Sequence, residues 1–310
     1  MKVVSLKKLK SEIDSAIKTL EFSEYKVLER KMLSIEGGNS QGVLARCHDW
    51  LGTNENSQPT IRVLSHLACS GGTLISKCIG AQPNVYVLSE THPHTLLNMY
   101  EGKAVYSPTD IVKLARYSNV PAIEKLEEKI FIKSVNELYT HVDSIGGDLV
   151  IREHLHSDYC VGEKPTKSAV IKLLKNDYKV IRLVTTRHPL DTFLSLENNG
   201  WLHFNPPTIN EFCKRYWLFI KEHSTSDVIR YEDFISKPSK YMQLISGNLE
   251  ISFDDAFKDT FPLIQITGDS GRSGDVIQPR VRREVPESTL LEARDSKYYI
   301  KICNKLGYDI

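Results

Sequence analysis

Residues 61–81, IRVLSHLACSGGTLISKCIGA, combine an apolar run, a glycine-rich turn and a second apolar segment. The first run is typical of a buried strand, which we predict over 61–67. Gly71 and Gly72 predict a turn, and the residues after them predict a helix over roughly 72–80. A strand that passes through such a turn into a helix usually holds an anion, because backbone N–H groups and the helix dipole meet there.

The turn from Ser70 to Thr73 has the residue types of a phosphate-binding loop. Gly71 and Gly72 let the backbone approach a ligand closely because they lack a Cβ, and the two hydroxyl side chains add donors. The lysine of the phosphate loop G-x-x-x-x-G-K-[ST] is missing. The alternative interpretation is a plain strand-to-helix turn without a ligand.

Apolar strands alternate with helices along the chain. Further strands are predicted over 84–90, 147–154, 178–187 and 227–234, and further helices over 168–176, 189–199 and 208–224. Residues 91–145 are predicted to be mostly helical, and 262–288 to be loop-rich before one terminal helix. The alternation predicts an α/β fold in which helices flank a mainly parallel sheet.

Ligands of open parallel sheets bind beyond the carboxyl ends of the strands. Four segments are therefore expected to converge at one edge of the sheet: 68–73, 88–92, 152–156 and 185–188. Residues 5–35 carry apolar side chains at helical spacing. We predict a helical extension over 1–58 that packs on the core, followed by an α/β domain over 59–310.

The bulk composition narrows the class of protein. The 310 residues include 40 basic and 39 acidic side chains, a balance that argues against a general binder of nucleic acid or membrane surfaces. No signal peptide or long apolar span is recognisable. The six cysteines are scattered without metal-binding spacing, so we expect a cytoplasmic protein with free thiols and no metal.

A second candidate anion site follows the strongest strand. Arg187 ends the strand 178–187, and Ser195 lies eight residues further on in the next predicted helix. Arginine offers planar, bidentate donors that suit a phosphate. The alternative is a surface arginine near a solvated serine.

These elements together resemble the sulfotransferase superfamily, whose members transfer a sulfuryl group from 3′-phosphoadenosine 5′-phosphosulfate (PAPS) on a three-layer, P-loop NTPase-like fold. The stretch CSGGTLISKCIGAQPNVYVLSET, 69–91, is similar to the loop-to-glutamate segment of tyrosylprotein and related sulfotransferases, and VIRYEDF, 228–234, is similar to a strand common in the superfamily. The resemblance implies that the loop holds the 5′-phosphosulfate, through Cys69, Ser70, Gly71, Gly72, Thr73 and Leu74. It also implies that Arg187 and Ser195 hold the 3′-phosphate.

One residue departs from the family pattern. Most members have Lys or Arg directly before the Ser-Gly pair, where this chain has Cys69. The missing positive charge has three candidate sources, namely Lys77, Arg152 and Arg272. Of these, Lys77 lies four residues after Thr73 and so on the same face of the predicted helix.

Two residues are candidates for the base that removes the acceptor's proton. Glu90 ends the strand 84–90 at the position of the catalytic glutamate of glutamate-using members. His154 ends VIREH, 150–154, which resembles a segment of cytosolic sulfotransferases in which histidine is the base; Arg152 would then replace the donor-contacting lysine. Glu90 is the preferred of the two.

The late segment 268–284 contains Gly271, Arg272 and Ser273 and then three further arginines. The family commonly has a loop here that folds over the 3′-phosphate, and the alternative is a flexible surface loop. We therefore predict donor contacts from Gly271, Arg272 and Ser273.

The predicted function is transfer of a sulfuryl group from PAPS to a hydroxyl or amine of a small-molecule or carbohydrate acceptor, leaving adenosine 3′,5′-bisphosphate. The alternatives are a P-loop phosphotransferase and a non-catalytic nucleotide-binding module, although no strand ending in an aspartate suited to Mg²⁺ is recognisable. Trp201, His203 and Phe204 are candidates for an acceptor-binding surface.

Overall fold

The structure is a computed structural model that describes residues 15, 58–95, 106–224, 227–268, 276–279 and 282–310. The unit from Pro59 to Ile310 is described here by itself. Almost all of the predicted helical extension, 1–58, lies outside the described residues, so that extension and its packing remain predictions.

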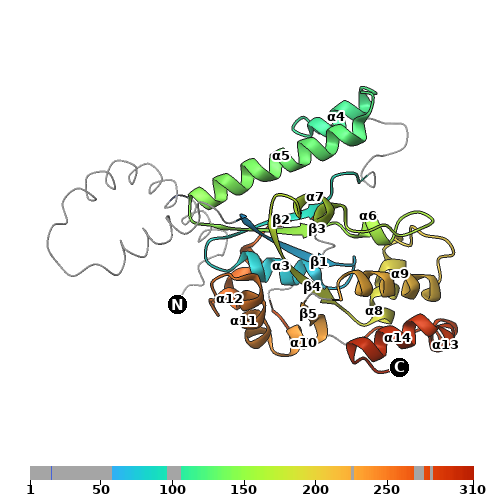
Figure 1. The fold of residues 1–310 in the computed structure, drawn as a ribbon. Helices are drawn as coiled ribbons and strands as arrows, with labels where there is room; N and C mark the ends of the chain where they lie inside the picture. Colours follow the sequence, from blue (N-terminus) through green and yellow to red (C-terminus); the bar gives the residue numbers. More distant parts are fainter. Residues whose placement is uncertain (1–14, 16–57, 96–105, 225–226, 269–275, 280–281) are drawn as a thin grey trace, which may run out of the picture. The chain divides into compact units, whose positions relative to one another are not determined.

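Five parallel strands form the centre of this unit, in the order β2-β3-β1-β4-β5 (Figure 1). Their bounds are β1 Thr60–His66, β2 Val85–Thr91, β3 Asp148–Glu153, β4 Lys179–Thr186 and β5 Asp227–Arg230. The predicted α/β fold with a parallel sheet is thus confirmed. Because β1 pairs with both β3 and β4, their carboxyl ends lie together: Leu64 is opposite Arg152, and His66 is opposite Thr185.

Helices cover both faces of the sheet. In chain order they are α3 Gly72–Gly80, α4 Ile111–Tyr117, α5 Ile123–Ser144, α6 His156–Tyr159, α7 Ala169–Leu174, α8 Pro189–Asn198, α9 Ile209–Glu222, α10 Tyr231–Ser236, α11 Pro238–Leu249, α12 Phe257–Thr260, the 3₁₀ turn η1 Phe261–Leu263, α13 Glu287–Asp295 and α14 Lys297–Leu306. Helix α3 has the predicted bounds. The strand alternation of β1 sends Ile61 and Val63 toward α5 and α7, and Leu64 toward α3, α10 and α11.

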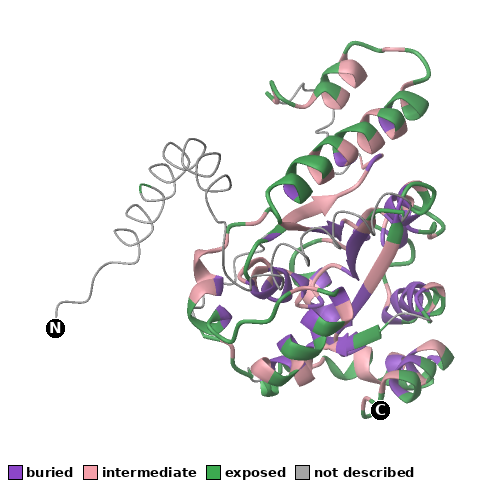
Figure 2. Cartoon of the chain, turned by 60° about the vertical axis from the view of Figure 1, so that its left-hand side comes forward, coloured by how far each residue is buried: buried purple, intermediate pink, exposed green. Residues whose placement is uncertain are grey.

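The buried residues gather in the sheet and on the inner sides of these helices, whereas α4 and α5 are largely half-buried or exposed (Figure 2). A third apolar cluster joins α8, α9, α13 and α14. Among the described residues, no helix is long and apolar enough to cross a membrane.

Two predictions about the last third of the chain were wrong. The strand predicted over 227–234 ends at Arg230, because Tyr231, Phe234 and Ile235 are buried at helical spacing and form α10. The single terminal helix is two helices, separated where the Ser296 hydroxyl accepts a hydrogen bond from the backbone N–H of Tyr299 and caps α14.

A buried arginine on α9 holds the segment that follows β3. Arg215 is fully buried, and its guanidinium pairs with Glu211 at 2.9 Å and donates to the carbonyl oxygens of Tyr159, Gly162 and Glu163. The turn after α6 is therefore fixed to α9 by a charge that has no access to water.

Replacing this arginine is expected to destabilise the fold. Arg215→Leu leaves Glu211 buried with only a half-exposed lysine as partner and removes the donors of three carbonyl groups, which should lower the free energy of unfolding by about 3–5 kcal/mol. Urea denaturation measures this loss, and the exposed Arg294→Leu on α13 is the control, expected within about 0.5 kcal/mol of the wild type. A loss below about 1 kcal/mol for Arg215→Leu would contradict the structural role.

Candidate active site

One cavity of about 1180 Å³ lies at the carboxyl ends of the strands of the sheet. Ten of the residues predicted from the sequence line it together: Cys69, Gly71, Gly72, Thr73, Leu74, Glu90, Arg152, His154, Arg187 and Ser195. The predicted convergence of the four segments at this edge is thus observed. Gly271, Arg272 and Ser273 lie outside the described residues, and their donor contacts remain predictions.

The loop after β1 is a tight turn with its own internal support. The hydroxyl of Ser70 donates to the carbonyl oxygen of Leu67 at 2.7 Å, so this buried serine shapes the loop and is not among the lining residues. Cys69 and Gly71 both have positive φ, 62° and 85°. A Cβ on Gly71 would lie 2.1 Å from the ring of Tyr231, so only glycine lets the loop approach that ring.

His66, which the sequence interpretation missed, supports the loop from below. A Cβ on Gly72 would lie 2.2 Å from its imidazole ring. The Arg152 Nε–H donates to His66 Nε2 at 2.7 Å, so the ring must carry its proton on Nδ1 and donate to the carbonyl oxygen of Leu67 at 2.9 Å. Burial, with the nearby Arg152 charge, lowers the pKa of His66 to about 4, consistent with a neutral ring.

Arg152 is the cation at the centre of the site. It is 3% exposed, and its guanidinium donates to the hydroxyls of Ser89 and Thr73 at 2.9 and 3.2 Å. It also pairs with Glu90 at 2.5 Å. Since Thr73 lies in the first turn of α3, a positive charge from β3 reaches the loop, which has Cys69 before its Ser-Gly pair.

Glu90 and His154 form a pair at the edge of the cavity. The Nδ1 of His154 hydrogen-bonds to one carboxylate oxygen of Glu90, and Arg152 pairs with the other. Glu90 has a φ of 57° at the point where the pairing of β2 with β3 shifts register. This irregularity turns the Glu90 side chain toward Arg152 and His154. Burial acts to raise the pKa of Glu90, but the His154 hydrogen bond and the Arg152 charge outweigh it and hold that pKa below its usual value.

Residues 267–268 close over Glu90. Gly268 has a φ of 69°, and a Cβ there would lie 2.3 Å from the Glu90 side chain. The carbonyl oxygen of Gly268 accepts from Thr73 at 3.2 Å, and the Thr267 hydroxyl donates to the carbonyl oxygen of Ser89 at 2.9 Å. The approach of this segment therefore requires glycine.

The second predicted anion element adjoins the first. Arg187 donates to the carbonyl oxygen of Cys69 at 3.2 Å and lies over the ring of Tyr231, 5.4 Å from its centroid. The Cys69 thiol contacts Ser195 and Asn199, and burial raises its pKa. The strand-end arginine, the helix serine and the loop thus border one space.

Two arginines of the late basic segment also line the cavity. Arg282 pairs with Asp191 at 3.0 Å, and Arg283 donates to the carbonyl oxygen of Leu194 at 3.4 Å. Both contacts are to α8, the helix that carries Ser195. Of the other candidates, Lys77 is not among the lining residues, and Phe204 packs in the core beside Phe212.

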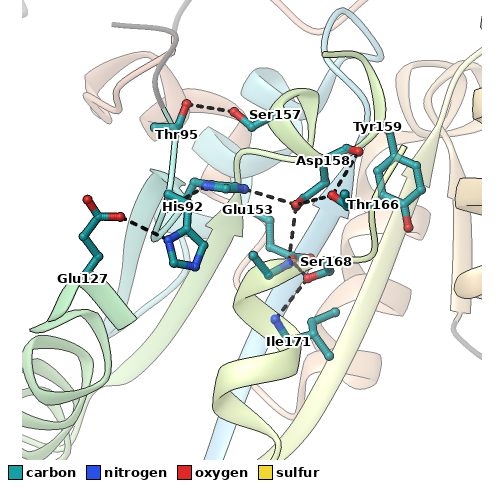
Figure 3. Close-up of polar contacts among 12 residues, drawn as sticks. His92, Thr95, Glu127, Glu153, Ser157, Asp158, Tyr159, Thr166, Ser168 and Ile171 are labelled. Carbon is teal, nitrogen blue, oxygen red and sulfur yellow. Dashed lines mark hydrogen bonds and ion pairs between the residues drawn. The ribbon is translucent and has the colours of Figure 1, made fainter. Parts of the chain in front are cut away.

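A buried polar network supports the strand that carries Arg152 and His154. Glu153 lies between them in the sequence and accepts a hydrogen bond from Ser65 on β1. It also accepts one from Ser168, whose hydroxyl caps α7 through the N–H of Ile171 (Figure 3). The neighbouring Asp158 accepts from His92 and Thr166, both at 3.2 Å. Glu153 thus ties β3 to β1 and to the start of α7, beside the cavity that it borders together with Arg152 and His154.

Within the described residues, no group of three or more His, Cys, Asp or Glu side chains is arranged to hold a metal ion. No protein-family model matches the sequence, and no curated protein matches it significantly.

Several solved structures are similar to this chain. The sulfotransferase domain of the Synechococcus PCC 7002 olefin synthase superposes with a TM-score of 0.53 at 15% identity, covering 83% of this chain and 97% of that domain. The sulfotransferase domain from the curacin biosynthetic pathway gives 0.49 at 14% identity, covering 81% and 99%. Retinol dehydratase in complex with retinol and PAP (adenosine 3′,5′-bisphosphate) has a TM-score of 0.36 at 12% identity, covering 83% of this chain and 84% of that chain. The superposition on the olefin synthase domain shows that the chain has the fold of that sulfotransferase domain.

The buried carboxyl behind the site is expected to make stability depend on pH. Burial raises the pKa of Glu153 from 4.5 to about 7. Between these two pH values the Glu153 carboxyl is therefore protonated in the folded protein and ionised in the unfolded chain. The contribution of Glu153 to stability should therefore fall as the pH rises from about 4.5 to 7, by roughly 3 kcal/mol. The buried histidines His66 and His156, whose pKa values are lowered, contribute in the opposite direction over this range, so the carboxyl is tested by comparing a variant with the wild type.

In Glu153→Gln the new side chain has nearly the shape of glutamic acid and is uncharged at every pH. The variant should therefore be more stable than the wild type at pH 8 and about equally stable at pH 5. Urea midpoints across this range measure the difference. Glu137→Gln, on the exposed side of α5, is the control and should follow the wild-type pH profile. Parallel profiles for wild type and Glu153→Gln would refute the buried titration.

Proposed function

We propose that the protein is a sulfotransferase that moves the sulfuryl group of PAPS to a hydroxyl or amine of a small-molecule or carbohydrate acceptor. One observation carries the proposal: the glycine loop, the Arg187–Ser195 pair and the Glu90–His154 pair line a single cavity. The shared fold of the olefin synthase sulfotransferase domain supports it.

The two anion elements suit the two ends of the donor. The glycine turn at the start of α3 offers N–H groups and a helix dipole to the 5′-phosphosulfate. Arg187 and Ser195 would bind the 3′-phosphate, with help from Arg283, which donates to the Leu194 carbonyl oxygen of α8 and also lines the cavity. Arg152 would supply the cation that the loop lacks at Cys69, because it already donates to the Thr73 hydroxyl.

His154 is the proposed base, with Glu90 as the residue that positions it. The carboxylate receives the Nδ1 hydrogen bond, so Nε2 is left as the nitrogen that takes the acceptor's proton. Glu90 is a weak base, because two partners stabilise its ionised form. This assignment reverses the order preferred from the sequence.

Donor recognition is tested by binding, independently of any acceptor. Adenosine 3′,5′-bisphosphate (PAP) should stabilise the full chain without Mg²⁺, by about 2.7 kcal/mol at a hundredfold excess over its dissociation constant. Arg187→Ala should lose most of this stabilisation in a thermal-shift assay, whereas Arg294→Ala should keep it. Stabilisation by Mg·ATP alone would favour a phosphotransferase, and PAP binding without transfer to any acceptor would favour a non-catalytic module.

The roles of the pair are separated by single substitutions. His154→Ala should lower kcat by about 10²–10⁴-fold with unchanged PAP affinity, and added imidazole should restore part of the activity. Glu90→Gln should lower kcat less, since the histidine remains, and imidazole should not restore it. Steady-state kinetics with PAPS measure both variants; a larger loss in Glu90→Gln than in His154→Ala would make the glutamate the base.

A further inference from the structure

Helix α8 forms a continuous wall of the cavity. Asp191, Ser195 and Asn199 follow one another at four-residue spacing and all line it. Residues four apart share one face of a helix, so a single face of α8 borders the cavity. This face extends from Asp191, near Arg187, to Asn199, which contacts the Cys69 thiol of the loop. The chain then continues into Trp201 and His203, which also line the cavity.

Three rings meet at the end of this wall, and we call His156, Trp201 and His203 the aromatic wall. His156 Nε2 and His203 Nδ1 are 3.0 Å apart and share a hydrogen bond. The ring of His156 lies 6.5 Å from that of Trp201 and 6.3 Å from that of His154, between centroids. The aromatic wall therefore adjoins the proposed base.

The backbone holds these rings in place. The N–H of Trp201 donates to the carbonyl oxygen of Leu196 at 2.9 Å, and the carbonyl oxygen of His203 accepts from Gly162 at 3.0 Å. Gly162 belongs to the turn that Arg215 fixes. A wall of this kind is ready to bind without rearrangement, which favours a ligand site.

The buried histidine of the aromatic wall, His156, is uncharged near neutral pH. Burial, with a contribution from His203, lowers the pKa of His156 to about 3, so that ring is uncharged near pH 7. The nearest carboxylate, Glu90, is already paired with Arg152 and His154. The remaining charged lining residues belong mainly to segments after β4 and β5, at the Arg187 end.

We propose that the aromatic wall is the acceptor subsite and that it selects an uncharged, ring-bearing hydroxyl compound, a saccharide or a phenol. The inference rests on the proposed function. The ring of such a compound can pack on the face of Trp201. Its hydroxyl can both donate and accept a hydrogen bond, so it suits either position of the proton between His156 and His203. A charged acceptor would gain no counter-charge from Trp201 or from the uncharged ring of His156.

The reaction at this subsite balances as follows. The acceptor hydroxyl gives its proton to His154 Nε2 as its oxygen forms a bond to the sulfur of PAPS. The bond from that sulfur to the phosphate oxygen breaks, and PAP leaves with the electron pair. The products are the sulfate ester, PAP and a proton released later from the histidine.

Calorimetric titration of the full chain saturated with PAP tests the selectivity. One matched set is methyl β-D-glucopyranoside, glucosamine and glucuronate; the other is 4-methylphenol, tyramine and 4-hydroxyphenylacetate. The neutral member of at least one set should bind tenfold or more tightly than its charged counterparts, and the set that binds identifies saccharide or phenol. Binding led by a charged member, or binding of none of the six, would overturn the proposal.

Substitutions locate the binding. Trp201→Ala and His203→Ala should weaken binding of the neutral compound by tenfold or more and raise its KM, with PAP affinity within twofold of the wild type. Trp201→Phe should retain most of the affinity, which guards against a variant that merely fails to fold. Trp217→Ala and His141→Ala are matched controls outside the cavity. Equal effects of Trp201→Ala and Trp217→Ala would overturn the proposal.

The two proposals fail differently. If PAP does not bind the wild type, the proposed function is wrong, and the same titrations without PAP still measure what the aromatic wall binds. If PAP binds but Trp201→Ala leaves the acceptor KM unchanged, the donor site stands and the acceptor subsite lies elsewhere.

Discussion

The buried guanidinium of Arg152 is the interaction on which the site depends. A cation that is 3% exposed is tolerated only when its donors are satisfied, and this one donates to groups from β1, α3 and β2 and to the carbonyl oxygen of Thr267. The strand ends, the glycine loop and residues 267–268 are therefore assembled around one charge. Glu90 is part of this arrangement as its counter-ion.

This arrangement gives a physical reason why the loop tolerates Cys69. The cation reaches the loop from the neighbouring strand, so the position before Ser70 is free to pack. There the thiol lies against Ser195 and Asn199 of α8, and the carbonyl oxygen binds Arg187. The loop and the second predicted anion element, Arg187 with Ser195, are thus joined directly through one residue.

The regular elements were largely predictable because their patterns are local. The strands β1 to β4 and helix α3 follow from runs and spacings that neighbouring residues determine. The segment 227–234 was not, since Tyr231, Phe234 and Ile235 suit either a short strand or one helical turn until their burial is known. His66 was missed for a similar reason: a histidine at a strand end shows its role only when Arg152 and Gly72 lie beside it.

By itself the sequence determined the α/β alternation, the glycine turn and the residues that carry the candidate chemistry, because these depend on residue type and short-range periodicity. Only the tertiary structure decided which groups act together. His154 and Glu90 are 64 residues apart and meet because β2 and β3 pair in parallel with a register shift at Glu90. The Glu90 carboxylate is thereby engaged by both His154 and Arg152, which favours the histidine as the base. No local sequence pattern encodes this contact between strands.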